Sequence, residues 1–146
     1  MGVLDDDLAV LFSDLDAAIG SVMEKEMTDE ARQTIREHIY DDVYSYEPRF
    51  YSRRKEAGGI ADKDNMEAQY EAQTMTLTVT ETADFQQLWG GDRPDYTTLA
   101  DEIERGNPKF SMKRAGKRPF MKNTQKELDN GRADKIIETG LKRRGF

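Results

Sequence analysis

The stretch TMTLTVT, residues Thr74–Thr80, decides the fold class, because here the apolar spacing changes from the helical period to a period of two. Met75, Leu77 and Val79 alternate with four threonines, a pattern typical of a β-strand that buries one face. Residues 66–72 alternate in the same way, which predicts either a second strand or one longer strand. Both interpretations place a small sheet in a chain that is otherwise helical, so the sequence predicts an α+β fold.

The N-terminal residues have the period of an α-helix. Asp5, Asp6 and Asp7 suit a first helical turn, where negative charge interacts favourably with the helix dipole. Thr28 is a candidate N-cap for a second helical run, which should end before Pro48 because a proline disfavours helical geometry in the preceding residue. The pattern leaves open whether one bent helix or two helices form. The apolar stripe of the first run consists of Leu4, Leu8, Leu11, Phe12, Leu15, Ile19, Val22 and Met23.

The C-terminal residues predict a further helix. Pro119 suits the first helical position, and Asn130 with Gly131 is expected to break or kink the helix. Phe120 should anchor the start of this helix against the strand face, a burial that stabilises by roughly 1.5–3 kcal/mol. We expect one domain, residues 1–146, in the order helical residues 1–45, loop 46–65, strand region 66–82, short helix 95–106, basic loop 107–118 and C-terminal helix 119–143.

The charge of the chain changes sign along its length. Of the 29 acidic residues, 25 lie before residue 105, whereas 13 of the 22 basic residues lie after residue 104. This separation fits a basic arm for nucleic acid, a basic end that meets the acidic face of another copy, or pairing of the two ends within one chain. Only 36% of the residues are hydrophobic, which predicts a thin core and favours burial against partners.

The sequence offers little for catalysis or metal binding. It contains no cysteine, no G-x-S-x-G motif and no glycine-rich phosphate loop. His38, the single histidine, lies inside a helical run and is more typical of packing than of a catalytic base. Asp62–Asn65 lacks the glycine and the distal glutamate of a calcium loop, so it is interpreted as a turn. We therefore expect no enzymatic activity, no metal site and no cofactor.

The chain also lacks the features of a secreted or membrane protein. Its first residues are acidic where a signal peptide would be basic. No apolar run approaches the roughly 20 residues of a membrane-spanning helix. We expect a soluble protein without a membrane partner.

Three short motifs follow one another along the chain. GGIADKDNM (Gly58–Met66) is followed by LADEIERGNP (Leu99–Pro108) and then by KRPFMKNT (Lys117–Thr124). In this order the motifs resemble the head–tail connector and tail-completion proteins, or neck proteins, of long-tailed bacteriophages, including those similar to minor tail protein Z. The resemblance spans most of the chain, although each motif is short.

Two further segments extend the resemblance and two features depart from it. YEPRFYSRRKEAGGI (Tyr46–Ile60) and GLKRRGF (Gly140–Phe146) are similar to segments of uncharacterised phage structural proteins. The loop after Pro48 is longer than the family pattern, and Arg105 stands where an aromatic residue is more usual. Contacts made by these two regions are therefore expected to differ from those of the family.

The resemblance implies a structural protein of the virion neck, present in the host cytoplasm during assembly, that forms a hexameric or dodecameric ring joining connector and tail. Its implied partners are other copies of the chain and neighbouring connector, tail-terminator or tail-tube proteins, with DNA contact at most secondary. The candidate interface residues, on two long partner-binding loops and the C-terminal helix, are Arg49, Tyr51, Arg53, Arg54, Lys113, Arg114, Lys117, Arg118, Phe120, Arg143 and Arg144. Of these, Phe120 is also typical of ordinary core. The alternative is a small phage or bacterial regulator that binds nucleic acid through the basic C-terminal third.

Overall fold

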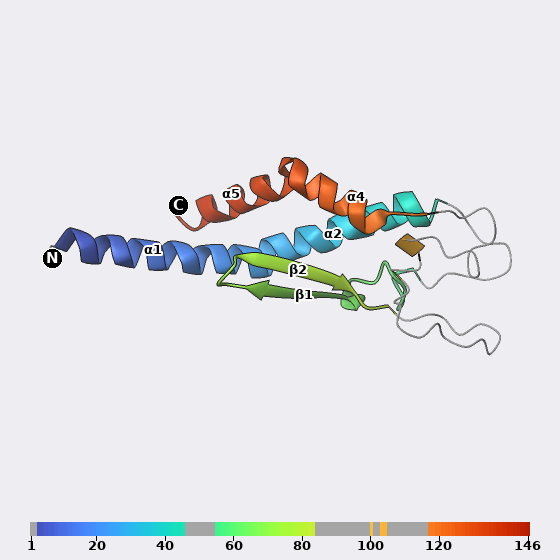
Figure 1. The fold of residues 1–146 in the computed structure, drawn as a ribbon, viewed down its shortest axis with the longest axis horizontal. Helices are drawn as coiled ribbons and strands as arrows, with labels where there is room; N and C mark the ends of the chain where they lie inside the picture. Colours follow the sequence, from blue (N-terminus) through green and yellow to red (C-terminus); the bar gives the residue numbers. More distant parts are fainter. Residues whose placement is uncertain (1–2, 46–54, 84–99, 101–102, 105–116) are drawn as a thin grey trace.

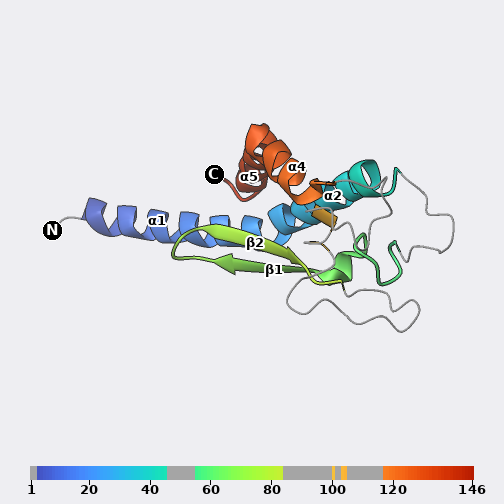
Figure 2. The same ribbon diagram turned by 45° about the vertical axis from the view of Figure 1, so that its right-hand side comes forward.

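The protein is built around one long helix, with a β-hairpin on one side and two shorter helices on the other (Figures 1 and 2). The computed structural model describes residues 3–45, 55–83, 100, 103–104 and 117–146. This architecture is the α+β fold that the spacing in Thr74–Thr80 predicts.

The long helix is continuous, which answers the question of one helix or two. It consists of α1 (Val3–Val22), a π-helical segment (Met23–Met27), α2 (Thr28–His38) and a second π-helical segment (Ile39–Val43). At 1.5 Å per residue it is about 60 Å long. The expected N-cap at Thr28 is wrong, because Thr28 has helical backbone angles and is buried. Its hydroxyl instead donates to the Met23 carbonyl oxygen at 2.8 Å, within the helix.

The hairpin consists of β1 (Met66–Glu71) and β2 (Thr76–Glu81), so the alternation at residues 66–72 marks a separate strand. The strands are antiparallel and pair Met66 with Glu81 at one end and Glu71 with Thr76 at the other. In β2, half-buried and buried residues alternate with exposed ones, as expected for a sheet with one covered face. In β1 only Met66 and Tyr70 are covered, and Ala68 between them is exposed. The covered face lies along the long helix (Figure 1).

The end of the hairpin nearest α1 differs from the sequence prediction at one residue. Met75, expected on the buried face of the strand, lies in the turn with φ 51° and is exposed. The turn needs this left-handed backbone, and the alternation therefore begins one step later, at Leu77. Beside the turn, the Tyr70 ring packs against Gly20 of α1, where an added Cβ would lie 3.5 Å from the ring.

The C-terminal helical region is kinked where the sequence indicates. It comprises α4 (Phe120–Glu127), a π-helical segment (Leu128–Arg132) and α5 (Ala133–Arg143). Asn130 and Gly131 leave the helical backbone, Gly131 with φ 98°, so the chain bends and lays α4 on α2 and α5 on α1. Pro119 is the residue before the helix rather than its first residue.

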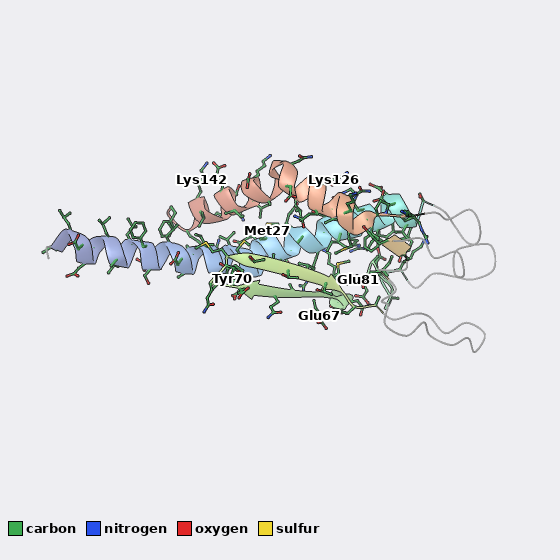
Figure 3. All side chains as sticks on the ribbon, in the orientation of Figure 1. Met27, Glu67, Tyr70, Glu81, Lys126 and Lys142 are labelled. Carbon is green, nitrogen blue, oxygen red and sulfur yellow. The ribbon has the colours of Figure 1, made fainter. Side chains whose placement is uncertain are left out.

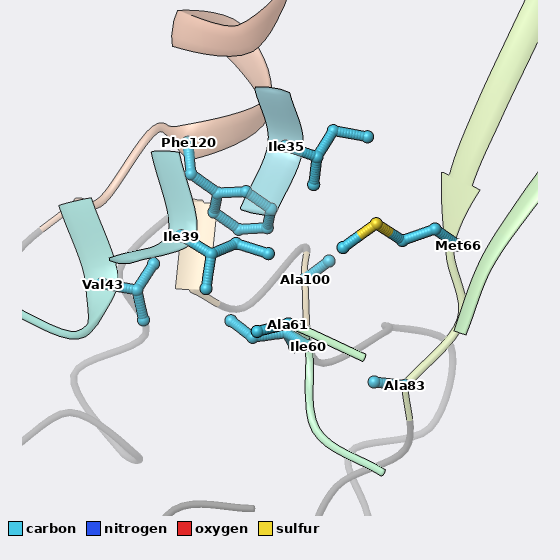
Figure 4. Close-up of a cluster of buried hydrophobic side chains, with 9 residues drawn as sticks. All are labelled: Ile35, Ile39, Val43, Ile60, Ala61, Met66, Ala83, Ala100 and Phe120. Carbon is cyan, nitrogen blue, oxygen red and sulfur yellow. The ribbon is translucent and has the colours of Figure 1, made fainter. Parts of the chain in front are cut away.

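The core lies where the long helix, the base of α4 and the open end of the hairpin meet (Figure 4). Phe120 has no exposed surface and packs in one cluster with Ile35 and Ile39 of the long helix, so the start of α4 is anchored in the core as expected. The expected contact with the strand face is thus mainly a contact with helix residues. The other members of the cluster are Val43, Ile60, Ala61, Met66, Ala83 and Ala100.

The N-terminal half of α1 extends beyond both neighbouring layers (Figure 1). The predicted helix with its apolar stripe is confirmed, but the stripe is not covered over the first four turns. Only Ala18 and Val22 of α1 are buried, because α5 and the hairpin reach no further along the helix. Large apolar side chains are exposed in this half, namely Val3, Leu4, Leu8, Val10, Leu11 and Phe12.

Candidate interaction surfaces

The predicted interface residues do not form one surface in the described part of the chain. Six of them lie outside the described residues: Arg49, Tyr51, Arg53, Arg54, Lys113 and Arg114. Lys117 is exposed before the base of α4, and Arg143 is exposed at the far end of α5. Phe120 is core, which leaves its side chain unavailable to a partner. The lysines of α4 and α5 point away from the body of the protein, as Lys126 and Lys142 show in Figure 3.

The base of α4 is capped by a carboxylate that is distant in sequence. The two oxygens of Glu104 accept hydrogen bonds from the amides of Met121 and Lys122, at 3.1 and 3.0 Å. The Arg118 amide donates to the Ile103 carbonyl oxygen at 3.2 Å. Together these bonds satisfy free amides at the helix N-terminus and hold residues 103–104 against it. No local sequence pattern indicates this cap, because Pro119 offers no side-chain acceptor.

Arg132 is the centre of an ion-pair network between α2 and the kinked C-terminal region. Its Nε lies 2.5 Å from Glu30 Oε1, one terminal nitrogen lies 2.9 Å from Glu37 Oε2, and the same nitrogen donates to Glu127. Hydrogen bonds from Arg132 lower the pKa values of Glu37 and Glu127, while Glu37 above all raises the pKa of Arg132. Arg132, Glu37 and Glu127 are therefore charged at neutral pH.

His38 lies beside this network and links the same two elements. Its Nε2 is 2.6 Å from Glu127 Oε2, and its Nδ1 is 3.4 Å from Asp42 Oδ2. Asp42 Oδ2 also accepts a hydrogen bond from the side-chain Nδ2 of Asn123 at 3.0 Å. The imidazole is only 19% exposed, between two packed helices. The geometry gives His38 a bridging role that the single-residue pattern in the sequence could not indicate.

The C-terminal end of α5 is tied to the acidic part of the long helix. Arg144 donates to both oxygens of Glu26, at 2.7 and 3.0 Å, and to Ser21 Oγ at 3.1 Å. The bond from Arg144 lowers the pKa of Glu26. Arg144, predicted as an interface residue, is thus used within the chain. Of the three interpretations of the charge separation, pairing within one chain accounts for Arg132 and Arg144.

A shallow hollow of about 540 Å³ lies over α2 and the π-helical segment that follows it. Gln33, Arg36, Glu37, Tyr40 and Asp41 line it, and it is open to solvent. Two of its lining residues are already hydrogen-bonded within the chain, because Arg36 and Tyr40 both donate to Glu56. A hollow of this kind suits a contact surface better than a small-molecule site.

Neighbouring aromatic rings extend this face towards the end of the long helix. The rings of Tyr40 and Tyr44 meet edge to face, with centroids 5.2 Å apart. The Lys55 ammonium lies 5.8 Å from the centroid of the Tyr44 ring, and the Arg36 guanidinium lies 5.9 Å from that of Tyr40. Lys55 and Ser45 flank residues 46–54, which carry four of the predicted interface residues. The described residues on either side of this segment therefore lie beside the aromatic face.

Comparison with known proteins identifies the family. The family model YomN matches residues 7–143, which is nearly the whole chain. The chain belongs to the YomN family. YomN is a phage-derived family, so the protein is phage-associated. No curated protein and no solved structure matches the chain.

The described residues of this YomN-family chain hold neither a candidate metal site nor a membrane span. Within residues 3–45, 55–83 and 117–146 and the three isolated described positions, no three His, Cys, Asp or Glu side chains are grouped to hold a metal ion. Among the helices that the structure describes, none has the length and apolar character to cross a membrane. Among the described charged groups, Arg132, Arg144 and His38 join the long helix to the C-terminal helices.

Proposed function

We propose that this YomN-family protein is a structural component of the phage neck, where copies form a ring between connector and tail. Membership of a phage-derived family supports a role in a phage, and the ordered motifs from Gly58 to Thr124 favour the neck. The observation that carries the proposal furthest is the incomplete burial of the described residues, above all those of α1. A thin core and a protruding apolar helix are expected of a subunit that completes its burial within an assembly.

The use of charge in the fold supports a structural role. Arg132, Arg144 and His38 hold helix against helix, which makes a rigid subunit with defined faces. The exposed bases that remain, on α4 and α5, can steer the encounter of subunits and fix their register. A neck component needs these properties and needs no reaction centre.

Native mass spectrometry and negative-stain imaging test this proposal. The protein is examined alone and mixed with the connector and tail-tube proteins of the same phage genome. A ring, or a stoichiometric complex with either partner, is the expected result. A strictly monomeric protein that binds neither partner contradicts the proposal.

The nucleic-acid regulator is tested separately by a gel shift at several salt concentrations. Pairing of Arg132 and Arg144 with Glu30, Glu37 and Glu26 reduces the charge available for phosphates. Tight binding with a steep loss of affinity at higher salt would favour the regulator over the neck protein.

A further inference from the structure

The apolar seam that joins α1 to α5 continues past the end of α5. Its inner part is closed: Ala18 and Val22 are buried, and Gly140 of α5 approaches Val22 so closely that an added Cβ would lie 2.8 Å from Val22 Cγ2. Arg144 bonds to Ser21 and Glu26 at the same contact. The seam is therefore an established helix–helix interface over the last turns of α1.

Towards the N-terminus the same seam is open. Leu4, Leu8, Leu11 and Leu15 precede Ala18 and Val22 at alternating steps of four and three residues, the repeat of a coiled-coil seam. Leu4 is 77% exposed, Leu8 48% and Leu11 51%. Figure 3 shows these turns of α1 standing clear of the hairpin and of α5. Four turns of a coiled-coil seam are thus presented without a partner in the described structure.

The charges beside the open seam define the partner. In the heptad that this seam defines, Asp7 and Asp14 lie along one border, whereas the other border carries Asp5 followed by Phe12 and Ile19. Asp16 lies further round the helix on that side. The four aspartates are exposed, and α1 contains no lysine or arginine. Pairing two copies of α1 would bring together two helices that each carry acidic residues and no basic residue, which is unfavourable. A helix with a basic border is complementary.

We propose that the open seam of α1 binds an amphipathic helix of another protein, with leucine-like residues on its apolar face and lysine or arginine beside that face, opposite Asp7 and Asp14. The helix would extend the interface that α5 makes with α1. In α5 the chain itself carries an example of this chemistry, since an apolar face and Arg144 meet the acidic long helix. The proposal does not depend on the neck assignment, because it rests on the seam and its charges alone.

Binding of two synthetic peptides to the full chain tests the proposal. Both peptides span three heptads with leucine at the seam positions, and one carries lysine and the other glutamate on the borders. Fluorescence anisotropy should show binding of the lysine peptide, weakened by salt, and no binding of the glutamate peptide. The double variant Leu8→Ser/Leu11→Ser should bind the lysine peptide at least about tenfold more weakly. Its melting temperature should be unchanged, since both side chains are exposed.

Two further variants separate the seam from general acidity. Val10→Ser changes an equally exposed apolar residue on the opposite side of α1 and should leave peptide binding unchanged. Asp7→Asn/Asp14→Asn keeps the seam but removes the acidic border and should weaken binding of the lysine peptide. Equal binding of both peptides, failure to bind either, or full binding by Leu8→Ser/Leu11→Ser overturns the proposal. Self-association that Leu8→Ser/Leu11→Ser abolishes in analytical ultracentrifugation also overturns it, because the occupant is then a second copy.

Discussion

Glu81, at the end of β2, has its carboxyl group inside the protein. The residue is 3% exposed, and one oxygen accepts the Ala83 amide hydrogen at 2.8 Å. The other oxygen has no hydrogen-bond partner within the described structure. Burial, with a smaller contribution from Asp62, raises the pKa of Glu81 to about 8. The native protein therefore keeps this carboxyl group protonated at neutral pH.

This group predicts a loss of stability as the pH rises. The pKa of Glu81 is about 8 in the native state, against 4.5 for a glutamate surrounded by water, as in the unfolded chain. Between these values the native state binds one more proton than the unfolded state. The stabilisation of the native state by the protonated Glu81 is complete below about pH 4.5 and is lost as the pH rises towards about 8. We expect the free energy of unfolding to fall by roughly 4 kcal/mol over this window. Urea denaturation at a series of pH values measures the change.

The isosteric variant Glu81→Gln isolates this effect. Glutamine cannot ionise, so the stability of the variant should be nearly independent of pH across the same window. Glu67→Gln, an exposed position on the outer side of the hairpin, should retain the wild-type profile. A wild-type pH profile in Glu81→Gln would show that another group is responsible.

A separate loss of stability is expected as the pH falls below about 4.5, because hydrogen bonds lower the pKa values of Glu26, Glu37 and Glu127 in the native state.

Arg132 is the second residue whose removal should be costly. Substitution by methionine keeps much of the side-chain volume but leaves Glu30, Glu37 and Glu127 close together without their shared cation. We expect a loss of about 2 kcal/mol in the free energy of unfolding, given that the groups are partly exposed. Added salt should reduce the loss. Lys126→Met, which removes an exposed charge from the same helical region, serves as the control in thermal melts.

At the scale of elements, the contact of α5 with α1 depends on Gly140. Gly140→Ala should destabilise the protein by about 1–2 kcal/mol, because the new methyl group overlaps the buried Val22 side chain and this outweighs the gain in helix propensity. The double variant Gly140→Ala/Val22→Ala should lose less than the sum of the two single variants, since the smaller side chain accommodates the methyl group. Chemical denaturation of the four proteins gives the coupling. Additive losses would mean that the two residues do not touch.

The sequence predicted those elements whose pattern is local. The alternation through Val79 located the hairpin, and Gly131 located the kink, because each depends on the backbone of a few neighbouring residues. The same alternation, continued by one step beyond Val79, places Glu81 on the covered face of the strand. The sequence pattern therefore also contained a signal for the burial of Glu81. The N-cap prediction for Thr28 was wrong because a threonine hydroxyl can form hydrogen bonds inside a helix as well as at its first residue. The open seam of α1 depends on where α5 ends, which no local pattern contains.

At the scale of the whole molecule, the charge separation along the chain has two outcomes. Arg132 and Arg144 neutralise the middle of the long helix from within the same chain. The aspartates of α1 stay exposed at one end of the long helix. Ser45 and Lys55, which flank the predicted contact loop, lie at its other end, where Lys55 meets the Tyr44 ring. Such a polar, elongated subunit is suited to contacts between unlike surfaces. Those contacts close into a ring when the rotation between subunits allows it.

Charge reversal in the loop between those flanking residues tests whether it makes the ring contact. Arg53→Glu/Arg54→Glu should weaken assembly by at least about tenfold, because two favourable charges become repulsive at a subunit interface. Folding should be preserved, with a melting temperature close to that of the wild-type protein. Lys126→Glu/Lys135→Glu makes the same change of charge on the exposed side of the C-terminal helices and separates a local contact from a general effect of net charge. Assembly measured by native mass spectrometry, beside thermal melts, distinguishes the cases. Intact assembly together with a collapse of thermal stability would place Arg53 and Arg54 in the fold rather than at the interface.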